Sequence, residues 1–170
     1  MTVHIDTLEG AVETFVEPEP LLFGVRFVTD TVGGVVAEGT DVSISTEGSF
    51  SLGDGGASFR ARFSVKVDVF KELWADVALS FTAPDQYSIS REAFLAFANG
   101  VVAPQLRNHA QRLWDPLLVE AGYPARILPQ ISGVFVGSQL PDTLGPAGME
   151  ELRKKESLTV ADVEGIPLGS

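Results

Sequence analysis

The side chains that most often perform catalysis or hold metals are scarce in this sequence of 170 residues, which has two histidines and no cysteine. His4 lies near the N-terminus and His109 lies in an amphipathic segment, and neither has a second histidine at the spacing of a metal site. We interpret His109 as a solvent-facing or interface residue. The lack of cysteine excludes disulfides, thiolate metal sites and thiol catalysis.

Glycines and serines offer no stronger sign of a catalytic site. The Gly-Asp-Gly-Gly at 53–56 is interpreted as a turn between strands, because no helix follows it whose N-terminus could hold a phosphate. The serines at positions 43, 45, 49 and 51 share one strand face without a nearby histidine, which is typical of a solvated face. We therefore predict a protein that is not an enzyme and has no metal or cofactor. A small hydrolase or isomerase that uses scattered carboxylates is the alternative.

The charge balance excludes a further class of function. Twelve Lys and Arg stand against twenty-three Asp and Glu, and the net charge of -11 repels a phosphate backbone. No run of eighteen apolar residues is present, and the N-terminus lacks the pattern of a signal peptide. We expect a cytoplasmic protein that neither binds nucleic acid nor inserts into a membrane.

Composition and residue pattern divide the chain into three parts. The first twenty residues contain five acids and no lysine or arginine, and they end in Glu-Pro-Glu-Pro at 17–20. This pattern predicts an acidic N-terminal arm over 1–20. A single α+β domain is expected over 21–148, and a short C-terminal helix or tail over 149–170.

Four segments alternate apolar and polar residues with the period of two that is typical of strands with one buried face. The clearest is 59–69, where every odd position is apolar and every even position is polar. The four segments are 21–27, 42–52, 59–69 and 73–81. They predict an α+β fold built on a four-stranded antiparallel sheet.

After the predicted strands, the apolar residues repeat with the spacing of a helix. Ser90 is a predicted N-cap for a short helix that ends at Asn99-Gly100, and a second helix runs from about 101 to 113. Asp115-Pro116 has the pattern of an N-cap followed by proline at the first helical position. We therefore expect a long helix that is kinked or broken near Trp114 and packed on one face of the sheet. A short strand is predicted at 133–136.

The chain has more apolar side chains than one sheet and one helix would hide, including eleven Phe and two Trp. Leu22, Val28 and Trp74 also lie out of phase with the main apolar positions. This surplus indicates a homo-oligomer or an exposed binding groove, unless loops and the arm cover it. Four cations on one strand and its turn form either a solvated face or a surface for an acidic segment: Arg60, Arg62, Lys66 and Lys71.

The junction of helix and tail resembles the SecB family of export chaperones. Pro104-Gln105-Leu106-Arg107 matches the Pro-x-x-Arg motif that opens the long helix of that family. The segment 122–131 matches the following Gly-x-Pro-x-x-x-Leu-Pro-x-Ile segment. Gln105 replaces the usual tyrosine and Asn108 the usual acid, so the chain resembles a divergent member.

The resemblance implies an ATP-independent holding chaperone that binds unfolded or non-native polypeptides through apolar grooves. Such proteins act in protein export or serve one dedicated partner, and the resemblance implies a SecA-type motor or a toxin system as a partner. We assign the client groove to apolar residues of the helical part and the first strand, although each would serve equally in a core. They are Phe23, Phe27, Leu106, Leu113, Trp114, Leu117 and Leu118. The alternative is a structural or assembly subunit, of a β-rich phage type, whose apolar faces are buried between copies.

Overall fold

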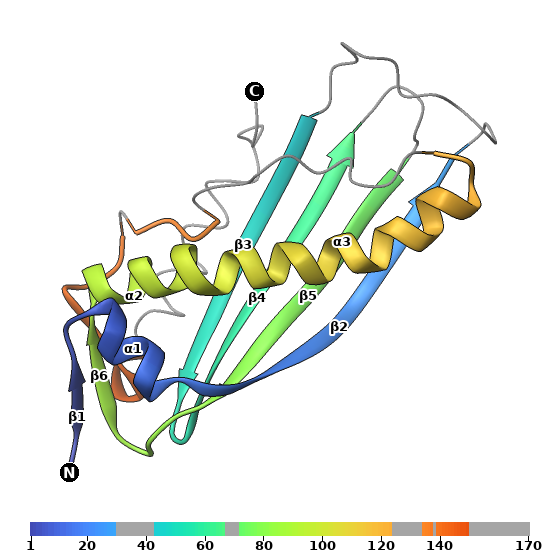
Figure 1. Cartoon of the computed structure of the whole chain (residues 1–170). Coiled ribbons are helices and arrows are strands. Elements are labelled where there is room, and N and C mark those ends of the chain that lie inside the picture. The colour runs from blue at the N-terminus through green and yellow to red at the C-terminus, as the bar shows by residue number, and fades with distance from the viewer. Residues whose placement is uncertain (30–42, 67–71, 124–133, 138, 150–170) are drawn as a thin grey trace.

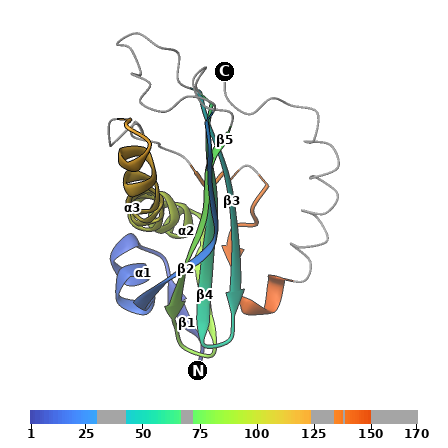
Figure 2. The same ribbon diagram turned by 90° about the vertical axis from the view of Figure 1, so that its right-hand side faces the viewer.

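The alternating segments form the expected antiparallel sheet. In a computed structural model, which describes residues 1–29, 43–66, 72–123, 134–137 and 139–149, the strand order is β2-β5-β4-β3. All the helices labelled in Figure 2 lie on one side of this sheet. The α+β prediction is therefore confirmed. The strands are β2 (Val16–Val28), β3 (Ser43–Gly53), β4 (Gly56–Lys66) and β5 (Glu72–Thr82).

The two central strands give the sheet a dry face and a wet face. On β4, Phe59 and Phe63 are fully buried, whereas Arg60 and Arg62 alternate with them and are exposed. Each β4 residue lies opposite a β5 residue on the same face, as Phe59 does with Leu79. The apolar face therefore lies toward the helices, and the face away from them, here called the outer face, carries the charges.

A β-bulge in β2 changes which face its residues use. Leu22 pairs with Val77 and Gly24 pairs with Asp76, so Phe23 is an extra residue between two pairs. Before the bulge, odd residues such as Leu21 lie on the outer face. After it, odd residues such as Val25 lie on the helix side.

The helical region is one continuous rod rather than two broken helices. Ser90 accepts a hydrogen bond from the Ala93 N–H and caps α2 (Arg91–Phe97), as predicted. A π-helical turn (Ala98–Val102) then leads directly into α3 (Ala103–Glu120), so the predicted end at Asn99-Gly100 is wrong. The ring of Pro104 crowds the carbonyl of residue 100, and the wider turn there accommodates it.

Of the two alternatives near Trp114, a kinked or a broken helix, the break is wrong, because α3 continues through Pro116. Residues of α3 at a spacing of three or four form one buried stripe against the sheet, and this packing keeps the helix together where proline removes a hydrogen bond. The stripe consists of Ala103, Leu106, Ala110, Trp114 and Leu118.

The acidic N-terminal segment is not an arm. It forms β1 (Val3–Ile5), α1 (Leu8–Thr14) and the beginning of β2. Ile5, Ala11 and Phe15 are all within 3 % exposure, and the Phe15 ring contacts aromatic rings of three other elements. The carboxylates occupy the outside of a segment whose apolar side completes the core.

A small second sheet joins the two ends of the described chain. β1 pairs in parallel with β6 (Tyr87–Ser90), and β6 pairs with β7 (Thr143–Leu144), followed by a 3₁₀ turn (Pro146–Gly148). Within the described residues, Val134 to Val136 pair with no strand, contrary to the strand expected at 133–136. Most of the 122–131 motif, Lys71 and the end of the tail after Met149 lie outside the described residues.

Candidate polypeptide-binding surface

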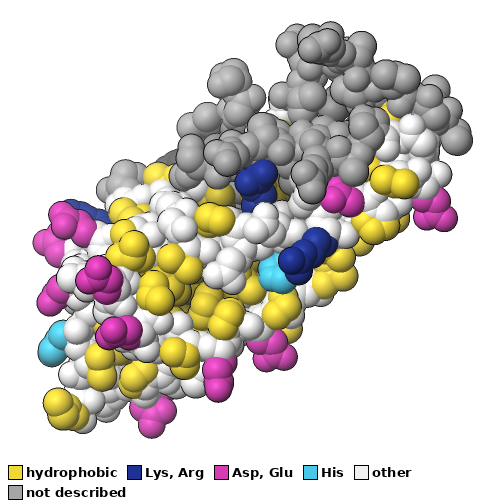
Figure 3. All heavy atoms as spheres, in the orientation of Figure 1, with side chains coloured by type: hydrophobic (Ala, Val, Ile, Leu, Met, Phe, Trp, Pro, Cys, Tyr) yellow, Lys and Arg dark blue, Asp and Glu magenta, His cyan; other side chains and the backbone are white. Residues whose placement is uncertain are grey.

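Several exposed apolar side chains lie on the helix side of the molecule. Leu8 and Val12 lie one turn apart on α1 and expose 40 % and 47 % of their surface, and Leu22 on β2 exposes 56 %. The register places Leu22 on the helix side, opposite Val77. Figure 3 shows hydrophobic side chains concentrated on this side between α1 and α3 and along β2. We call Leu8, Val12 and Leu22 the helix-side patch.

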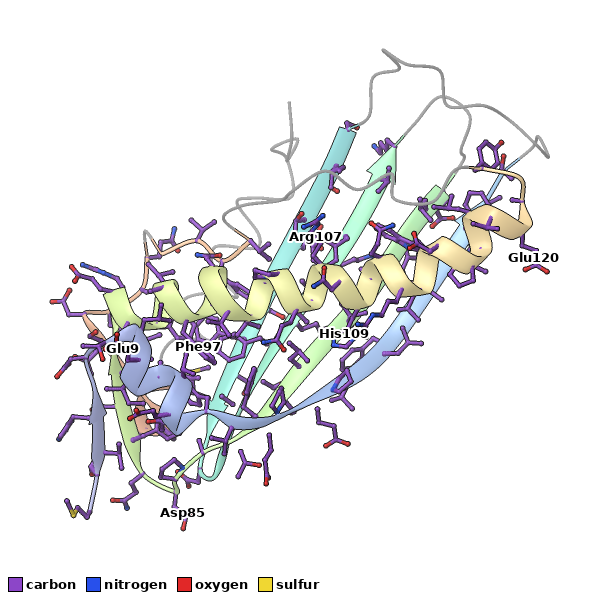
Figure 4. The ribbon with its side chains drawn as sticks, viewed as in Figure 1. Glu9, Asp85, Phe97, Arg107, His109 and Glu120 are labelled. Atoms are coloured by element: carbon purple, nitrogen blue, oxygen red, sulfur yellow. The ribbon has the colours of Figure 1, made fainter. Side chains whose placement is uncertain are left out.

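Charged groups lie around this patch rather than within it. Glu9 and Glu13 are exposed on α1 beside the apolar pair. Figure 4 shows His109 and Arg107 leaving α3 on opposite sides. Burial lowers the pKa of His109, and the nearby positive charge of Arg112 lowers it further, so the ring is neutral at pH 7. Exposed apolar patches rimmed by polar residues are typical of interaction sites.

Three of the seven predicted client residues lie in the core. Leu106, Trp114 and Leu118 are at most 1 % exposed, since the apolar stripe of α3 faces the sheet. They are therefore unavailable on the surface of the chain, and this part of the site prediction needs correction. A helical apolar stripe has the same pattern whether it faces a core or a client, which is why the sequence does not separate the two.

Three others lie half-buried on the helix side. Leu113 and Leu117 are four residues apart on α3, and Phe27 on β2 packs edge-on against the ring of Tyr123. Phe27 and Leu113 also pack against the core, so only part of each side chain is available. The binding role of these three residues stays a prediction.

Phe23 lies on the opposite side of the sheet from the helical residues. It is 55 % exposed, and the Arg60 guanidinium lies 3.9 Å from the centre of its ring. The predicted groove is therefore not one continuous surface, because the bulge separates Phe23 from Phe27.

The outer face is a network of arginines, acids and aromatics. Arg60 donates two hydrogen bonds to the Asp76 carboxylate, at 2.8 and 2.7 Å, and these bonds raise the pKa of Arg60. Arg62 lies 4.3 Å from the centre of the Trp74 ring. Arg60 therefore meets Asp76 of β5, whereas α1, with Glu9 and Glu13, lies on the other side of the sheet.

The residues that sequence reasoning missed are those of α1. Leu8, Ala11, Val12 and Phe15 follow the spacing of an amphipathic helix, and Thr7 caps it by accepting from the Gly10 N–H at 3.1 Å. The acids interleaved with these apolar residues are equally typical of a solvated arm. Among the described residues, no group of three or more His, Asp or Glu is placed to hold a metal ion.

A four-stranded antiparallel sheet with one long joined helix across a single face is the fold of the SecB-like chaperones. One solved structure with this fold is the SecB-like chaperone Rv1957 of Mycobacterium tuberculosis, bound to a ChAD peptide from the Rv1956 HigA1 antitoxin. The match has a TM-score of 0.52 and 13 % identity, and it covers 71 % of this chain and 89 % of that one. The predicted SecB-like fold is therefore confirmed.

Comparison of the sequence with known proteins finds no match. No protein-family model matches the chain, and no curated protein is significantly similar to it. No helix in the described part of the chain is long and apolar enough to span a membrane.

Proposed function

We propose that the protein is an ATP-independent holding chaperone that binds unfolded or non-native polypeptides on the helix-side patch. The exposure of Leu8, Val12 and Leu22 on one face carries this proposal. Burying a leucine-sized side chain contributes about 1.5–3 kcal/mol and makes no demand on the sequence of the client. The SecB-like fold and the peptide complex of the structural neighbour support the proposal. Leu113, Leu117 and Phe27 extend the patch in this proposal.

We also propose that the protein works in the cytoplasm as a homo-oligomer, either a dimer or a tetramer. No described strand pairs with the outer edge of β2, so its backbone groups are available to a second copy. The antitoxin peptide of the neighbour favours one dedicated partner over general export. The SecA-type motor and the toxin system stay predictions.

The test is light scattering of a chemically unfolded client diluted into buffer with the protein and without nucleotide. A holding chaperone suppresses the aggregation of the client at stoichiometric amounts, beyond the effect of an inert acidic control protein. No suppression at several-fold excess would contradict a general holding activity.

A neighbouring pair of residues provides a matched comparison of the two faces. Leu22 and Phe23 are adjacent and expose 56 % and 55 %, but they lie on opposite faces of the sheet. We expect Leu22→Ser to weaken suppression severalfold and Phe23→Ser to leave it nearly unchanged. The reverse result would move the client site to the outer face.

The alternative of a structural or assembly subunit makes a different prediction for the patch. In that case the patch is buried permanently between copies, and Leu22→Ser breaks the oligomer in size-exclusion chromatography with no client present. A chaperone patch instead stays accessible, so the same substitution leaves the size of the oligomer unchanged.

A further inference from the structure

The outer face of the sheet carries cations that have no acidic partner among the described residues. On β4, which lies between β3 and β5 (Figure 1), Arg60 is paired with Asp76, but Arg62 and Lys66 are exposed and form no ion pair within the described part of the chain. Glu47 of β3 lies opposite Arg62 in the register, but no ion pair joins the two. In a chain with nearly twice as many acids as bases, two such cations on one strand favour an acidic partner.

Apolar side chains lie next to these cations. Leu21 and Phe23 of β2 expose 42 % and 55 % of their surface on the outer face. The ring of Trp74 on β5 reaches across to β2, since a Cβ at Gly24 would lie 2.9 Å from it. On its other side the guanidinium of Arg62 lies 4.3 Å from the ring centre. The outer face therefore suits a segment that carries both apolar and acidic side chains.

The C-terminal segment of the chain has this composition. Residues 156–164 read Glu-Ser-Leu-Thr-Val-Ala-Asp-Val-Glu and contain three acids and no lysine or arginine. Alternate residues of an extended chain share one side. In an extended conformation, Leu158, Val160, Asp162 and Glu164 would share one side, with the two apolar residues before the two acids.

The described chain ends where this segment has access to the outer face. Figure 2 shows the 3₁₀ turn (Pro146–Gly148) on the side of the sheet away from the helices. This turn lines one cavity with Gly53, next to the hairpin that joins β3 and β4. Arg62 lies six residues along β4 from that hairpin, a distance of about 20 Å. Leu158 follows Met149 by nine residues, which span up to about 30 Å, so the segment is long enough to reach Arg62.

We propose that residues 156–164 bind the outer face of their own chain. The acids at 162 and 164 pair with Arg62 and Lys66, and the apolar residues at 158 and 160 pack against the rings of Phe23 and Trp74. The segment then acts as an internal competitor, because a partner with an acidic and apolar peptide reaches the outer face only by displacing it. Since the outer face lies opposite the helix-side patch, this contact does not depend on client binding.

Because the chain has no cysteine, an introduced pair of cysteines reports the contact. The full chain with Ser64→Cys, opposite Trp74 on the outer face, and Thr159→Cys is oxidised with copper phenanthroline. We expect both thiols to be lost without a dimer on a non-reducing gel. The control pair is Thr159→Cys with Asn108→Cys, at an exposed position of α3, and it should react at least tenfold more slowly. Equal rates for the two pairs would overturn the proposal.

Two matched changes of charge test what holds the segment. Adding Asp162→Asn and Glu164→Gln to the Ser64 and Thr159 cysteine pair should slow the reaction at least fivefold, because the ion pairs with β4 are lost. Adding Glu150→Gln and Glu151→Gln instead removes the same charge from the same end of the chain and should leave the rate unchanged. Equal effects of the two double changes, or no effect of either, would contradict the pairing with β4.

The remaining outcomes are also decisive. A disulfide-linked dimer in place of the internal disulfide would assign the contact to a second copy and overturn the proposal for the chain's own segment. If Ser64→Cys does not fold by circular dichroism, Ser45→Cys, its neighbour on β3, replaces it with the same expected rates. Suppression of client aggregation without the internal disulfide contradicts this contact alone. The disulfide without suppression contradicts the holding function alone.

Discussion

Two aromatic side chains on the outer face lie beside arginines. This arrangement reduces the apolar surface of the rings that a client can reach. Arg60 covers Phe23, and Arg62 covers Trp74, whose indole N–H also donates to Glu72 at 2.7 Å. A guanidinium over a ring stabilises the pair and shields part of the apolar surface. Leu22 lies on the other face of the sheet, away from these two arginines, which is why equal exposure is expected to give unequal binding.

The Arg60–Asp76 pair supports the sheet from the outer face. Asp76 is 8 % exposed and accepts both bonds from an arginine whose side chain is 45 % exposed. We expect Asp76→Asn to lower the free energy of unfolding by about 1–2 kcal/mol, because a charge-assisted bidentate contact is lost but solvent screens part of it. Urea denaturation followed by circular dichroism measures the change.

The more exposed pair on the same face is the control. Arg26 and Glu72 lie 3.0 Å apart with side chains that are 59 % and 40 % exposed. Arg26→Gln should cost less than about 0.5 kcal/mol. Equal costs for Asp76→Asn and Arg26→Gln would show that burial of the carboxylate contributes nothing.

Tyr87 makes stability depend on pH in the alkaline range. Burial raises the pKa of its hydroxyl above the ordinary value, a hydrogen bond with the Gly53 backbone opposes this, and the charge of Asp54 raises it further. The hydroxyl donates to the Gly56 carbonyl at 2.9 Å. Since the folded state keeps the proton longer than the unfolded state, this stabilisation is present below about pH 10 and is lost as the pH rises further.

Urea denaturation at pH 8 and pH 10.5 tests this dependence. The loss of stability between the two pH values should be smaller in Tyr87→Phe, which should also cost about 1 kcal/mol at pH 8 through the lost hydrogen bond. An identical pH dependence in the variant and the unaltered protein would refute the assignment.

The placement of single residues was predictable only where the strand had no irregularity. The alternation of 59–69 assigned the faces of β4 correctly from Phe59 to Lys66. The alternation of 21–27 put Phe23 and Phe27 on one face, but the bulge at Phe23 separates them. One extra residue reverses the facing of every residue after it, and its only local signs are the out-of-phase Leu22 and the glycine at position 24.

Among the elements, α3 is the one that departs most from its local sequence preference. Pro116 lies inside it and removes a backbone hydrogen bond, yet the helix continues to Glu120. The packing of Trp114 and Leu118 against the sheet outweighs that loss.

Replacing this proline should therefore stabilise the protein. We expect Pro116→Ala to raise the free energy of unfolding by about 1–3 kcal/mol, because the missing bond is restored at an exposed position. Thermal unfolding measures the change, and Val119→Ala, 60 % exposed on the same helix, should stay within about 0.5 kcal/mol. A lower stability of Pro116→Ala would show that the proline ring contributes to packing.

Elements with a strong period were predictable, and elements that depend on distant partners were not. All four strands of the main sheet and the N-cap at Ser90 were predicted, with shifts of a few residues at the ends. β6 and β7 are four and two residues long and exist only because β6 pairs on both sides. The continuity of α2 with α3 across Asn99-Gly100 was missed because glycine favours a break locally, whereas burial against the sheet is a property of the whole fold.

For the whole molecule, the N-terminal segment is part of the core rather than an appendage. Phe15 lies between Phe81, Tyr87 and Phe97, at ring distances of 6.5, 5.3 and 5.2 Å. It joins the main sheet, the small sheet and the helical rod in one place.

Truncating this ring tests the correction of the predicted arm. Phe15→Ala should lower the free energy of unfolding by about 3–5 kcal/mol through the cavity it creates. Val12→Ala, on the exposed side of the same short helix, should cost less than about 0.5 kcal/mol. Chemical denaturation of both variants measures the difference, and similar small costs would restore the interpretation of an independent arm.

The strand order also determines how long the first segments wait for their partner strand during synthesis on the ribosome. β3, β4 and β5 are sequential neighbours, but β2 pairs with β5, which begins roughly 40 residues after β2 ends. At about 5–20 residues per second, β2 and α1 wait for about two to nine seconds before their partner strand is translated. During that interval the apolar side chains of the first 28 residues have no sheet to cover them, so the nascent chain itself has the exposed surface that a holding chaperone binds.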